Sequence, residues 1–542
     1  MTITASPRPR RGLPGAVVAV ATATMLLAAC TSGGDDTTGG GSSTPRSGGT
    51  LRFAVSSDAG CVDPQQVGSN DTIYSLRQVV DSLTDQDPAT GKIVPWLAKS
   101  WTVSKDATTF TFKLRPGVTF SDGSKLTAQV VKENFDAVPD LGPLAVLAKG
   151  YLSGIESVTA VDPLTVRVSF AKPNAQFLQA SSTFSLGIES SASVKRTPQQ
   201  RCSKGIVASG PFTLAKYVPN QSITLAKRRG YDWGSSLWRK RGEAYLDRLV
   251  FTIVPEAGVR TGSLQSGQVD AIGSVGKADE AALKGAGIAL QTRANPGIVF
   301  NLAFNNARPL VRDVRVRQAI QVAVNRQEIV DAVYPTGTRP ATSVLSHTTP
   351  QYANLGSALG YDQAKARSLL TAAGWTVGSG GIRVKDGRRL SLSVRWFANA
   401  ATNKPALELL QQQLKAVGVE LVLEETPIAS IATVQQSGNF DALWGNITRA
   451  DPDILRSSYS TKLANVYRLS AGPLDPVLAG QAAATTPARR AGLAAQAQRL
   501  VVGNAYAIPV VELETELGVA KKVHDLRFEA SSRIQLHDTW IG

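Results

Sequence analysis

The chain has little of the chemistry that metal and redox sites need. It contains three cysteines, three histidines and two methionines among 542 residues. The histidines, His347, His524 and His537, are widely spaced, and no two of them stand at the spacing of metal ligands. The sequence therefore predicts no metal site, and we expect the protein to work without a cofactor.

Long apolar runs are missing as well. A membrane-spanning helix needs roughly 18 or more apolar residues, and no stretch after the N-terminal segment approaches that length. The one apolar run near the N-terminus, at about residues 16–27, is also too short to span a bilayer. It follows Arg8, Arg10 and Arg11 and leads into small residues, which is the composition of a cleavable signal peptide.

The sequence Leu27-Ala28-Ala29-Cys30 resembles a bacterial lipobox. The resemblance implies that residues 1–29 are removed as a lipoprotein signal peptide and that Cys30 carries acyl chains such as palmitate. The protein would then be held by lipid on the extracytoplasmic face of the bacterial cell membrane. The alternative is an ordinary signal peptide in which the cysteine is incidental.

The next segment favours the lipid anchor. Residues 31–49 are rich in Gly, Ser and Thr and have no apolar surface to bury, which predicts a flexible coil. Together with the modified Cys30, residues 30–49 would form a tether with a root-mean-square span of roughly 25 Å. A soluble body on such a tether can turn freely just above a membrane.

Two cysteines remain once Cys30 is assigned to lipidation. An exported protein folds in an oxidising compartment, so Cys61 and Cys202 are a candidate disulfide. The alternative is two unrelated buried thiols, and the sequence leaves both open.

The positive charge does not indicate a nucleic-acid partner. The formal charge of +16 falls to +13 without the three arginines of the leader. The remaining Lys and Arg residues are scattered, whereas nucleic-acid binding favours clusters interleaved with aromatic residues. We interpret the charge as a solvated surface that favours an anionic membrane or wall.

The first half of the chain predicts strands and a hairpin. Residues 51–55 alternate like a strand, and residues 101–103 and 110–114 are two period-2 runs joined by a polar turn. A third alternating run covers residues 164–170. About 490 residues follow the tether, enough for two or three domains with a large core.

The second half predicts helices and one strand–helix–strand unit. Asp313 caps an expected helix with apolar positions up to Val333, which Pro335 ends, and Asp362 caps another that Gly374 ends. Strands at 390–396 and 419–423 enclose a helix that Pro405 opens. Hairpins in one half and a βαβ unit in the other predict two α/β lobes.

A set of short blocks spans the chain from about Gly48 to its C-terminus. They cover residues 95–101, 106, 110–123, 126–128, 209–212, 314–319, 325–329, 362–375, 507–510 and 538–540. The ordered set resembles the peptide/nickel family of extracellular solute-binding proteins, family 5, which are receptors of ABC importers. The blocks themselves carry structural residues, so the resemblance identifies the fold more than the chemistry.

The resemblance implies a two-lobed periplasmic-binding-protein (Venus-flytrap) fold of type II, α/β, with an additional subdomain in lobe one. The chain would cross between the lobes near 294–297 and near 506–509. Lobe one would then be 48–294 plus 507–542, and lobe two 295–506. A solute held in the cleft would be buried by hinge closure and delivered to permease subunits.

Loops at the ends of strands line the cleft of such a fold, which gives candidate solute-binding residues. The candidates are Ser57, Asp58, Ser209, Gly210, Trp396, Phe397, Asn399, Trp444, Thr448, Arg449 and Asp451. The alternative for each aromatic residue is a place in the core, and for Asn399 or Arg449 a solvated loop.

The chain departs from the family at one of these sites. Peptide-binding members have an acidic residue a few positions before an Asp-Pro pair, which meets the α-amine of the peptide. Here Thr448 and Arg449 precede Asp451-Pro452, so a free α-amine would lack its carboxylate. If Arg449 faces the cleft, it would suit an anionic or carboxylate-bearing solute.

Enzyme motifs are missing. Ser169-Phe-Ala-Lys172 matches Ser-x-x-Lys, but these residues end a strand instead of opening a helix, and no other hydrolase or phosphate-loop motif occurs. We therefore expect a monomeric binding protein, not an enzyme, that captures a peptide or another small organic solute. The alternatives are a lipoprotein of the same fold that senses or presents a ligand without transport, and an exported hydrolase.

Overall fold

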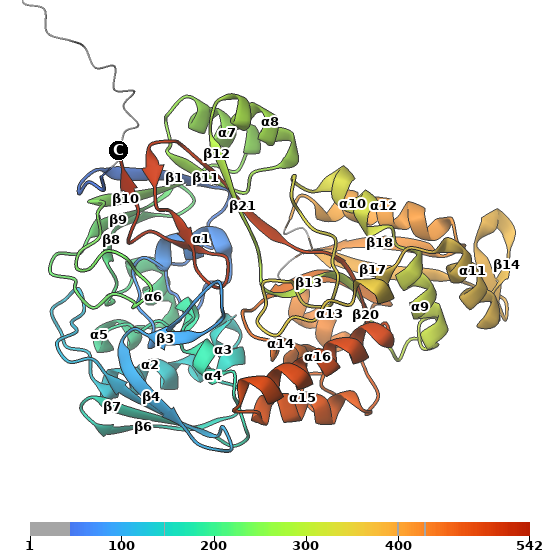
Figure 1. Ribbon diagram of the computed structural model, residues 1–542, viewed down its shortest axis with the longest axis horizontal. Helices are drawn as coiled ribbons and strands as arrows, with labels where there is room; N and C mark the ends of the chain where they lie inside the picture. Colours follow the sequence, from blue (N-terminus) through green and yellow to red (C-terminus); the bar gives the residue numbers. More distant parts are fainter. Residues whose placement is uncertain (1–43, 146, 398–399, 428–429) are drawn as a thin grey trace, which may run out of the picture. The chain divides into compact units, whose positions relative to one another are not determined.

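Two large β-sheets organise the chain (Figure 1). The computed structural model describes residues 44–145, 147–397, 400–427 and 430–542, so Cys30 and Asn399 lie outside the described residues. All helices and strands of this part belong to one unit, Pro45–Gly542. Among the described residues, none of the helices is long and apolar enough to cross a membrane.

The first sheet has seven strands in the order β12-β21-β11-β1-β10-β9-β8. Its strands are β1 (Thr50–Val55), β8 (Phe212–Val218), β9 (Ser222–Lys227), β10 (Arg248–Ile253), β11 (Ala271–Gly273), β12 (Ala289–Ala294) and β21 (Glu514–Val519). The central strand β1 runs parallel to β10 and β11, and the outer pairs are antiparallel.

The second sheet has five strands in the order β18-β17-β19-β13-β20. Its strands are β13 (Gly297–Phe304), β17 (Ser391–Phe397), β18 (Glu420–Thr426), β19 (Ala442–Thr448) and β20 (Ala507–Val511). The chain passes from the first sheet to the second between β12 and β13, and back again between β20 and β21.

A third sheet of four antiparallel strands packs on helix α2 (Ala128–Asp140) and has its own core. Its order is β4-β5-β7-β6, with β4 (Ala98–Val103), β5 (Thr109–Leu114), β6 (Ile155–Asp162) and β7 (Thr165–Phe170). Phe110, Phe112, Phe135 and Phe170 surround Phe177 edge-on in that core. The smaller strands are β2 (Thr84–Gln86), β3 (Ile93–Pro95), β14 (Thr376–Val377), β15 (Arg383–Lys385), β16 (Arg388–Arg389), β22 (Val523–His524), β23 (Arg527–Phe528), β24 (Ile534–Gln535) and β25 (Trp540–Ile541).

Helices cover the sheets and fill the space between them (Figure 1). In the first part of the chain they are α1 (Asn70–Leu76), α2 (Ala128–Asp140), α3 (Ala148–Tyr151), α4 (Phe177–Ala180), α5 (Ser191–Val194), α6 (Pro198–Lys204), α7 (Ala257–Gln265) and α8 (Lys277–Gly285). In the second part they are α9 (Val314–Ala323), α10 (Arg326–Val333), α11 (Gln363–Ala372), α12 (Asn403–Lys415), α13 (Ile431–Ser437), α14 (Ile454–Tyr459), α15 (Leu474–Ala483) and α16 (Pro487–Gly503).

The local predictions agree with these elements, with one correction. The hairpin is β4–β5, and the strand–helix–strand unit is β17–α12–β18, with β17 and β18 parallel. The single helix expected from Asp313 to Val333 is wrong, because it is two helices, α9 and α10. Val324 is extended, and the Asn325 side chain accepts a hydrogen bond from the backbone N–H of Glu328, so a second N-cap interrupts the helical spacing.

Candidate functional site

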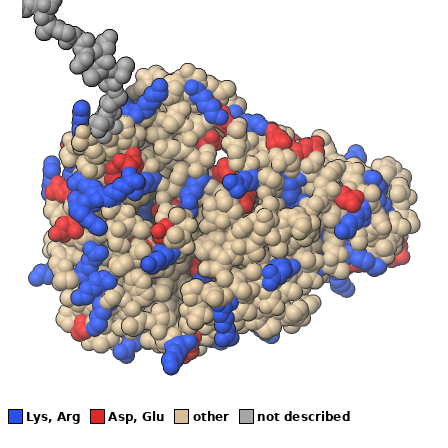
Figure 2. All heavy atoms as spheres, viewed as in Figure 1, with Lys and Arg blue, Asp and Glu red and all other residues tan. Residues whose placement is uncertain are grey.

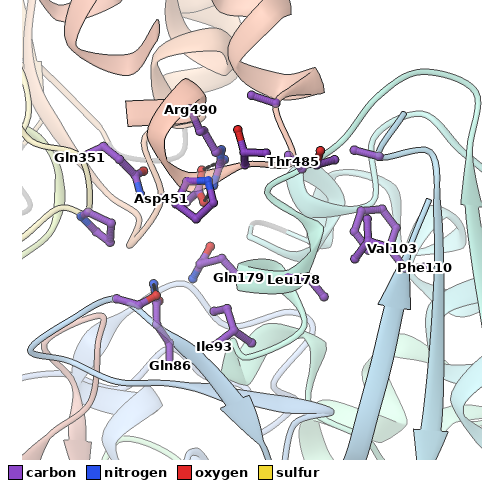
Figure 3. A pocket seen from close by; sticks show the side chains of 17 residues that line it. Gln86, Ile93, Val103, Phe110, Leu178, Gln179, Gln351, Asp451, Thr485 and Arg490 are labelled. Carbon is purple, nitrogen blue, oxygen red and sulfur yellow. Dashed lines mark hydrogen bonds and ion pairs between the residues drawn. The ribbon is translucent and has the colours of Figure 1, made fainter. Parts of the chain in front are cut away.

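A cavity of about 210 Å³ lies between two distant parts of the chain (Figure 3). Residues from the 86–179 segment line one side, and residues from the 350–490 segment line the other. Two hydrogen bonds join the sides directly. The Gln86 side chain donates to the carbonyl of Ala450 over 3.1 Å, and the backbone N–H of Ala175 donates to the carbonyl of Ala482 over 2.8 Å.

Three glutamine side chains supply unused acceptors at this cavity. The Oε1 atoms of Gln86, Gln179 and Gln351 are buried, and none has a hydrogen-bond partner among the described residues. The Nε2 atom of Gln86 donates to two backbone carbonyls, those of Gly91 and Ala450, which fixes the orientation of its amide. Since a buried acceptor is costly to leave unpaired, these oxygens suit a ligand that carries N–H or O–H donors.

The rest of the wall on the 86–179 side is apolar. Ile93, Val103, Phe110 and Leu178 come from β3, β4, β5 and α4 and lie together at this side in Figure 3. Apolar walls with a few placed polar groups are typical of sites for small organic molecules.

The charged groups at the opposite wall neutralise one another. Both Asp451 carboxylate oxygens accept hydrogen bonds from Arg490, over 2.6 and 2.8 Å. The neighbouring Asp453 is held in the same way by Arg456, over 2.7 and 2.8 Å. Burial raises the pKa of the Asp453 carboxyl, and the hydrogen bonds from Arg456 oppose that rise. Asp451 therefore lines the cavity, but its charge is already paired.

Arg449 does not line the cavity, and no carboxylate pairs with it among the described residues. Its guanidinium carbon lies 4.4 Å from the centre of the Tyr151 ring, and its Nη1 donates to Ser457 Oγ over 3.3 Å. Tyr151 is the last residue of α3, so this side chain reaches from the end of β19 to the part of the chain that carries the third sheet. Thr448 lies just before it, paired with Gly297 in the ladder between β13 and β19.

The candidates that follow β1 lie in a turn and do not line this cavity. The Ser57 hydroxyl donates to Asp71 over 2.9 Å. Asp58 accepts from the Tyr217 hydroxyl over 2.7 Å and from the backbone N–H of Asn220 over 2.9 Å. The Asp58 contacts hold the segment after β1 against the β8–β9 hairpin, and the Ser57 contact ties it to α1.

Ser209 and Gly210 do not line the cavity either, and their contacts are structural. Ser209 is buried, and its carbonyl accepts from the Trp233 indole over 3.1 Å. At Gly210 the backbone N–H donates to the carbonyl of Val79 over 2.8 Å. A side chain at this position would meet the Val79 backbone, so the close approach itself requires glycine.

The aromatic candidates from the second sheet lie in cores. Trp396 and Trp444 belong to the large core of the second sheet, and Phe397 belongs to a small neighbouring one. Trp444 stacks on Phe300 with 5.5 Å between ring centres, and its indole donates to Asn403 over 3.1 Å. Asn399, between these strands and α12, is outside the described residues.

The residues of the cavity that the sequence analysis did not name are mainly Gln86, Gln179, Gln351 and Arg490. These glutamines lie in a short strand (β2), a short helix (α4) and a turn, where they carry no periodic or motif signal, and they come together only where distant segments meet. The Asp451-Pro452 pair was the one feature of the sequence that pointed to this cavity, because Asp451 lines it and binds Arg490.

Away from the cavity, the structure contains a disulfide between Cys61 and Cys202, with 4.1 Å between the Cα atoms. Arg201, next to Cys202, donates to Asp63 over 2.9 Å and to Glu189 over 2.7 Å, and all three side chains are buried. Burial, together with the Asp63 charge, raises the pKa of Glu189 to about 8. Among the described residues, no group of three His, Cys, Asp or Glu side chains is arranged to hold a metal ion.

Solved structures show which class of fold this is. NikA from Brucella suis, solved in complex with Fe(III)-EDTA, superimposes with a TM-score of 0.78 at 23% sequence identity, over 91% of this chain and 100% of that one. The fold is therefore that of the two-lobed periplasmic binding proteins.

Within that class, the chain belongs to the bacterial extracellular solute-binding proteins of family 5, whose family model matches residues 92–465. It is 28% identical over 400 residues to the nickel-binding periplasmic protein of Escherichia coli (strain K12), a match that covers 70% of this chain and 74% of the relative. It is also 28% identical over 465 residues to heme-binding protein A of Haemophilus influenzae, over 80% of this chain and 82% of that protein.

Proposed function

We propose that this chain is the solute-binding subunit of an ABC importer, anchored by lipid at Cys30, and that it captures a small organic solute. The observation that carries the proposal is the cavity between the 86–179 and 350–490 segments, with its three unpaired glutamine oxygens. Membership of family 5 supports a binding role outside the cytoplasm. The relatives are named for different ligands, nickel and heme, so the residues of this chain have to indicate its solute.

We propose that the division into two lobes corresponds to the division into sheets. Lobe one would contain the first and third sheets, and lobe two the second sheet. The first boundary, at 294–295, agrees with the change of sheet between β12 and β13. Because β20 pairs with β13, we propose to move the second boundary from 506–507 to the residues between Val511 and Glu514. Two short crossings of this kind permit hinge motion, and a solute that contacts both lobes favours the closed state.

The solute would carry both a carboxylate and N–H groups. Arg449 offers a cation that no described carboxylate neutralises, which suits an anion. The glutamine oxygens are neutral acceptors and suit amide N–H groups. A free ammonium is less well served, because Asp451 is already bound by Arg490. Peptides with a blocked or modified amine, and similar amide-bearing acids, fit this description.

The test begins with the compound that the purified protein retains, identified by mass spectrometry after denaturation. Calorimetry with that compound should give one site per chain, and Gln179→Leu should weaken binding by roughly tenfold, since a buried hydrogen bond is worth about 0.5–1.5 kcal/mol. Gln199→Leu, on the exposed face of α6, is the matched control and should bind normally.

Equal affinity of Gln179→Leu and the native chain would contradict this assignment of the cavity. Uptake of the compound by cells that carry the gene and its permease, and loss of uptake without the gene, would distinguish import from sensing or presentation. Binding without uptake would favour a role in sensing or presenting the ligand.

A further inference from the structure

Basic side chains gather where the chain enters the Pro45–Gly542 unit. The backbone N–H of Gly48 donates to the carbonyl of Tyr245 over 2.8 Å, and that of Asp247 donates to the carbonyl of Gly49 over 2.9 Å. In the next residue pair, Thr50 lies opposite Arg248 in the β1–β10 ladder. Residues 48–50 are therefore fixed beside the segment that ends at Arg248.

Residues 227–248, together with Arg46, form a surface that we call the entry surface. Its basic residues with exposed or half-buried side chains are Arg46, Arg229, Arg239, Lys240, Arg241 and Arg248, and the Lys227 side chain is buried. Figure 2 shows a band of Lys and Arg side chains over this side of the molecule, around β9 and β10. The acidic residues of the same stretch are Asp232, Glu243 and Asp247.

Most of the carboxylates at the entry surface already form ion pairs. Glu243 pairs with Arg229 over 3.1 Å, Asp247 pairs with Lys227 over 2.7 Å, and Asp525 pairs with Arg239 over 3.1 Å. Within the part of the chain that the structure describes, Arg46, Lys240, Arg241 and Arg248 have no ion pair. Four unpaired cations therefore remain on one surface.

The backbone of this surface is held in place by other contacts. Both oxygens of Asp538 accept backbone N–H groups, from Arg239 over 2.8 Å and from Lys240 over 3.1 Å. The Lys240 ammonium lies 4.8 Å from the centre of the Tyr245 ring. The Asp538 carboxylate thus fixes the backbone of the Arg239–Lys240 turn.

We propose that the entry surface lies against anionic lipid headgroups. The inference rests on the proposed lipid anchor at Cys30, which would place the start of the Pro45–Gly542 unit near a bilayer. The composition of residues 31–44 predicts a coil, and a coil of this length would span roughly 20 Å. A surface carried that close to a negatively charged bilayer is attracted by each Lys or Arg that faces it, and salt weakens the attraction. The contact would orient the two lobes relative to the membrane.

Vesicle sedimentation tests the proposal without depending on lipidation or on the solute. The protein used is the chain from residue 31 onward, which lacks Cys30 and keeps the whole Pro45–Gly542 unit with its own cores. We expect it to bind vesicles of equal parts phosphatidylglycerol and phosphatidylcholine at 50 mM NaCl. It should not bind pure phosphatidylcholine vesicles, and 500 mM NaCl should release it.

Two triple variants separate the surface from the net charge. Lys240→Gln/Arg241→Gln/Arg248→Gln should weaken vesicle binding by roughly tenfold or more, because three of the unpaired cations are removed. Lys404→Gln/Arg367→Gln/Arg388→Gln removes the same charge from exposed sites on α11, α12 and β16, and should bind as the native chain does.

Equal losses in the two triple variants would overturn the proposal, and so would equal binding to neutral vesicles or no binding to anionic ones. Release of the protein by 10 mM inorganic phosphate at constant ionic strength would also overturn it, because that result indicates a site for a single phosphate ion. Solute affinity is measured in parallel, and its retention in the first variant separates this inference from the proposed function.

Discussion

The guanidinium of Arg449 lies face-on to the Tyr151 ring, 4.4 Å from its centre, and joins the end of β19 to the end of α3. The two residues are far apart in the sequence and belong to the two proposed lobes. Cation–π contacts of this kind hold a cation in place while leaving it without a counter-ion. Arg449 does not itself line the cavity, but it stands two residues before the cavity residue Asp451 and carries a positive charge that no described carboxylate neutralises.

Replacing Arg449 should therefore weaken solute binding strongly. We expect Arg449→Ala to raise the dissociation constant for the retained compound by at least tenfold, because a charge-assisted hydrogen bond is worth about 1.5–3 kcal/mol. Calorimetry measures this directly. Arg388→Ala, on the exposed strand β16, is the control and should leave the affinity unchanged. An unaltered affinity in Arg449→Ala would refute the anion-binding role.

Most of the fold could be predicted from the sequence, because its elements carry local signals. The alternation in β5 and the helical spacing in α12 follow from which side chains each element buries. The break between α9 and α10 was missed because the apolar spacing continues across it, and only the Asn325 cap marks the new start.

The cavity could not be predicted in the same way. Gln86, Gln179 and Gln351 come from three separate segments, and no periodicity relates them. The sequence suggested Trp444 and Trp396 as site residues, because loops at the ends of strands line the cleft in this class of fold. In the structure Trp444 packs against Phe300, and both tryptophans lie in the core of the second sheet. Tertiary contacts decide which side of an element faces the solute.

The disulfide should contribute strongly to stability. Cys61 and Cys202 are 141 residues apart, so the cross-link removes much of the entropy of the unfolded chain. We expect Cys61→Ala/Cys202→Ala to lower the free energy of unfolding by about 3–5 kcal/mol in urea denaturation. The native protein in reducing agent should approach the variant, and equal midpoints for oxidised native protein and variant would contradict this prediction.

Stability should also depend on Glu516. Burial raises the pKa of its carboxyl from 4.5 to about 7, and the charges of Glu280 and Glu514 add to the rise. Between these two pH values the folded chain holds a proton that the unfolded chain has released, so the Glu516 contribution to stability falls as the pH rises from about 4.5 to 7.

The variant Glu516→Gln stays neutral at every pH. It should be more stable than the native chain at pH 8 by about 1 kcal/mol, a value reduced for solvent screening, and equally stable at pH 4.5. Thermal unfolding at both pH values measures this difference. Glu408→Gln, on the exposed face of α12, is the control, and a native-like pH profile in Glu516→Gln would contradict the assignment.

Gly210 should not tolerate a side chain. A Cβ atom there would lie 2.4 Å from the backbone carbonyl carbon and oxygen of Val79, and a backbone cannot move aside as a side chain can. We expect Gly210→Ala to lower the free energy of unfolding by about 1–3 kcal/mol, measured in urea. Gly258→Ala in α7 meets no atom within 4 Å and should be neutral or slightly stabilising. Similar stabilities for the two variants would contradict this prediction, because they would show that the Val79 backbone can move to accommodate a Cβ atom.

The central claim is that an organic anion is bound at this cavity, and a crystal structure of the protein with its retained compound tests it most directly. We expect a carboxylate of the compound to lie within about 4 Å of the Arg449 guanidinium. Its N–H groups should donate to at least one of the Gln86, Gln179 and Gln351 oxygens. A compound bound elsewhere, a bare metal ion, or a peptide whose free α-amine is held at Asp451 would contradict it.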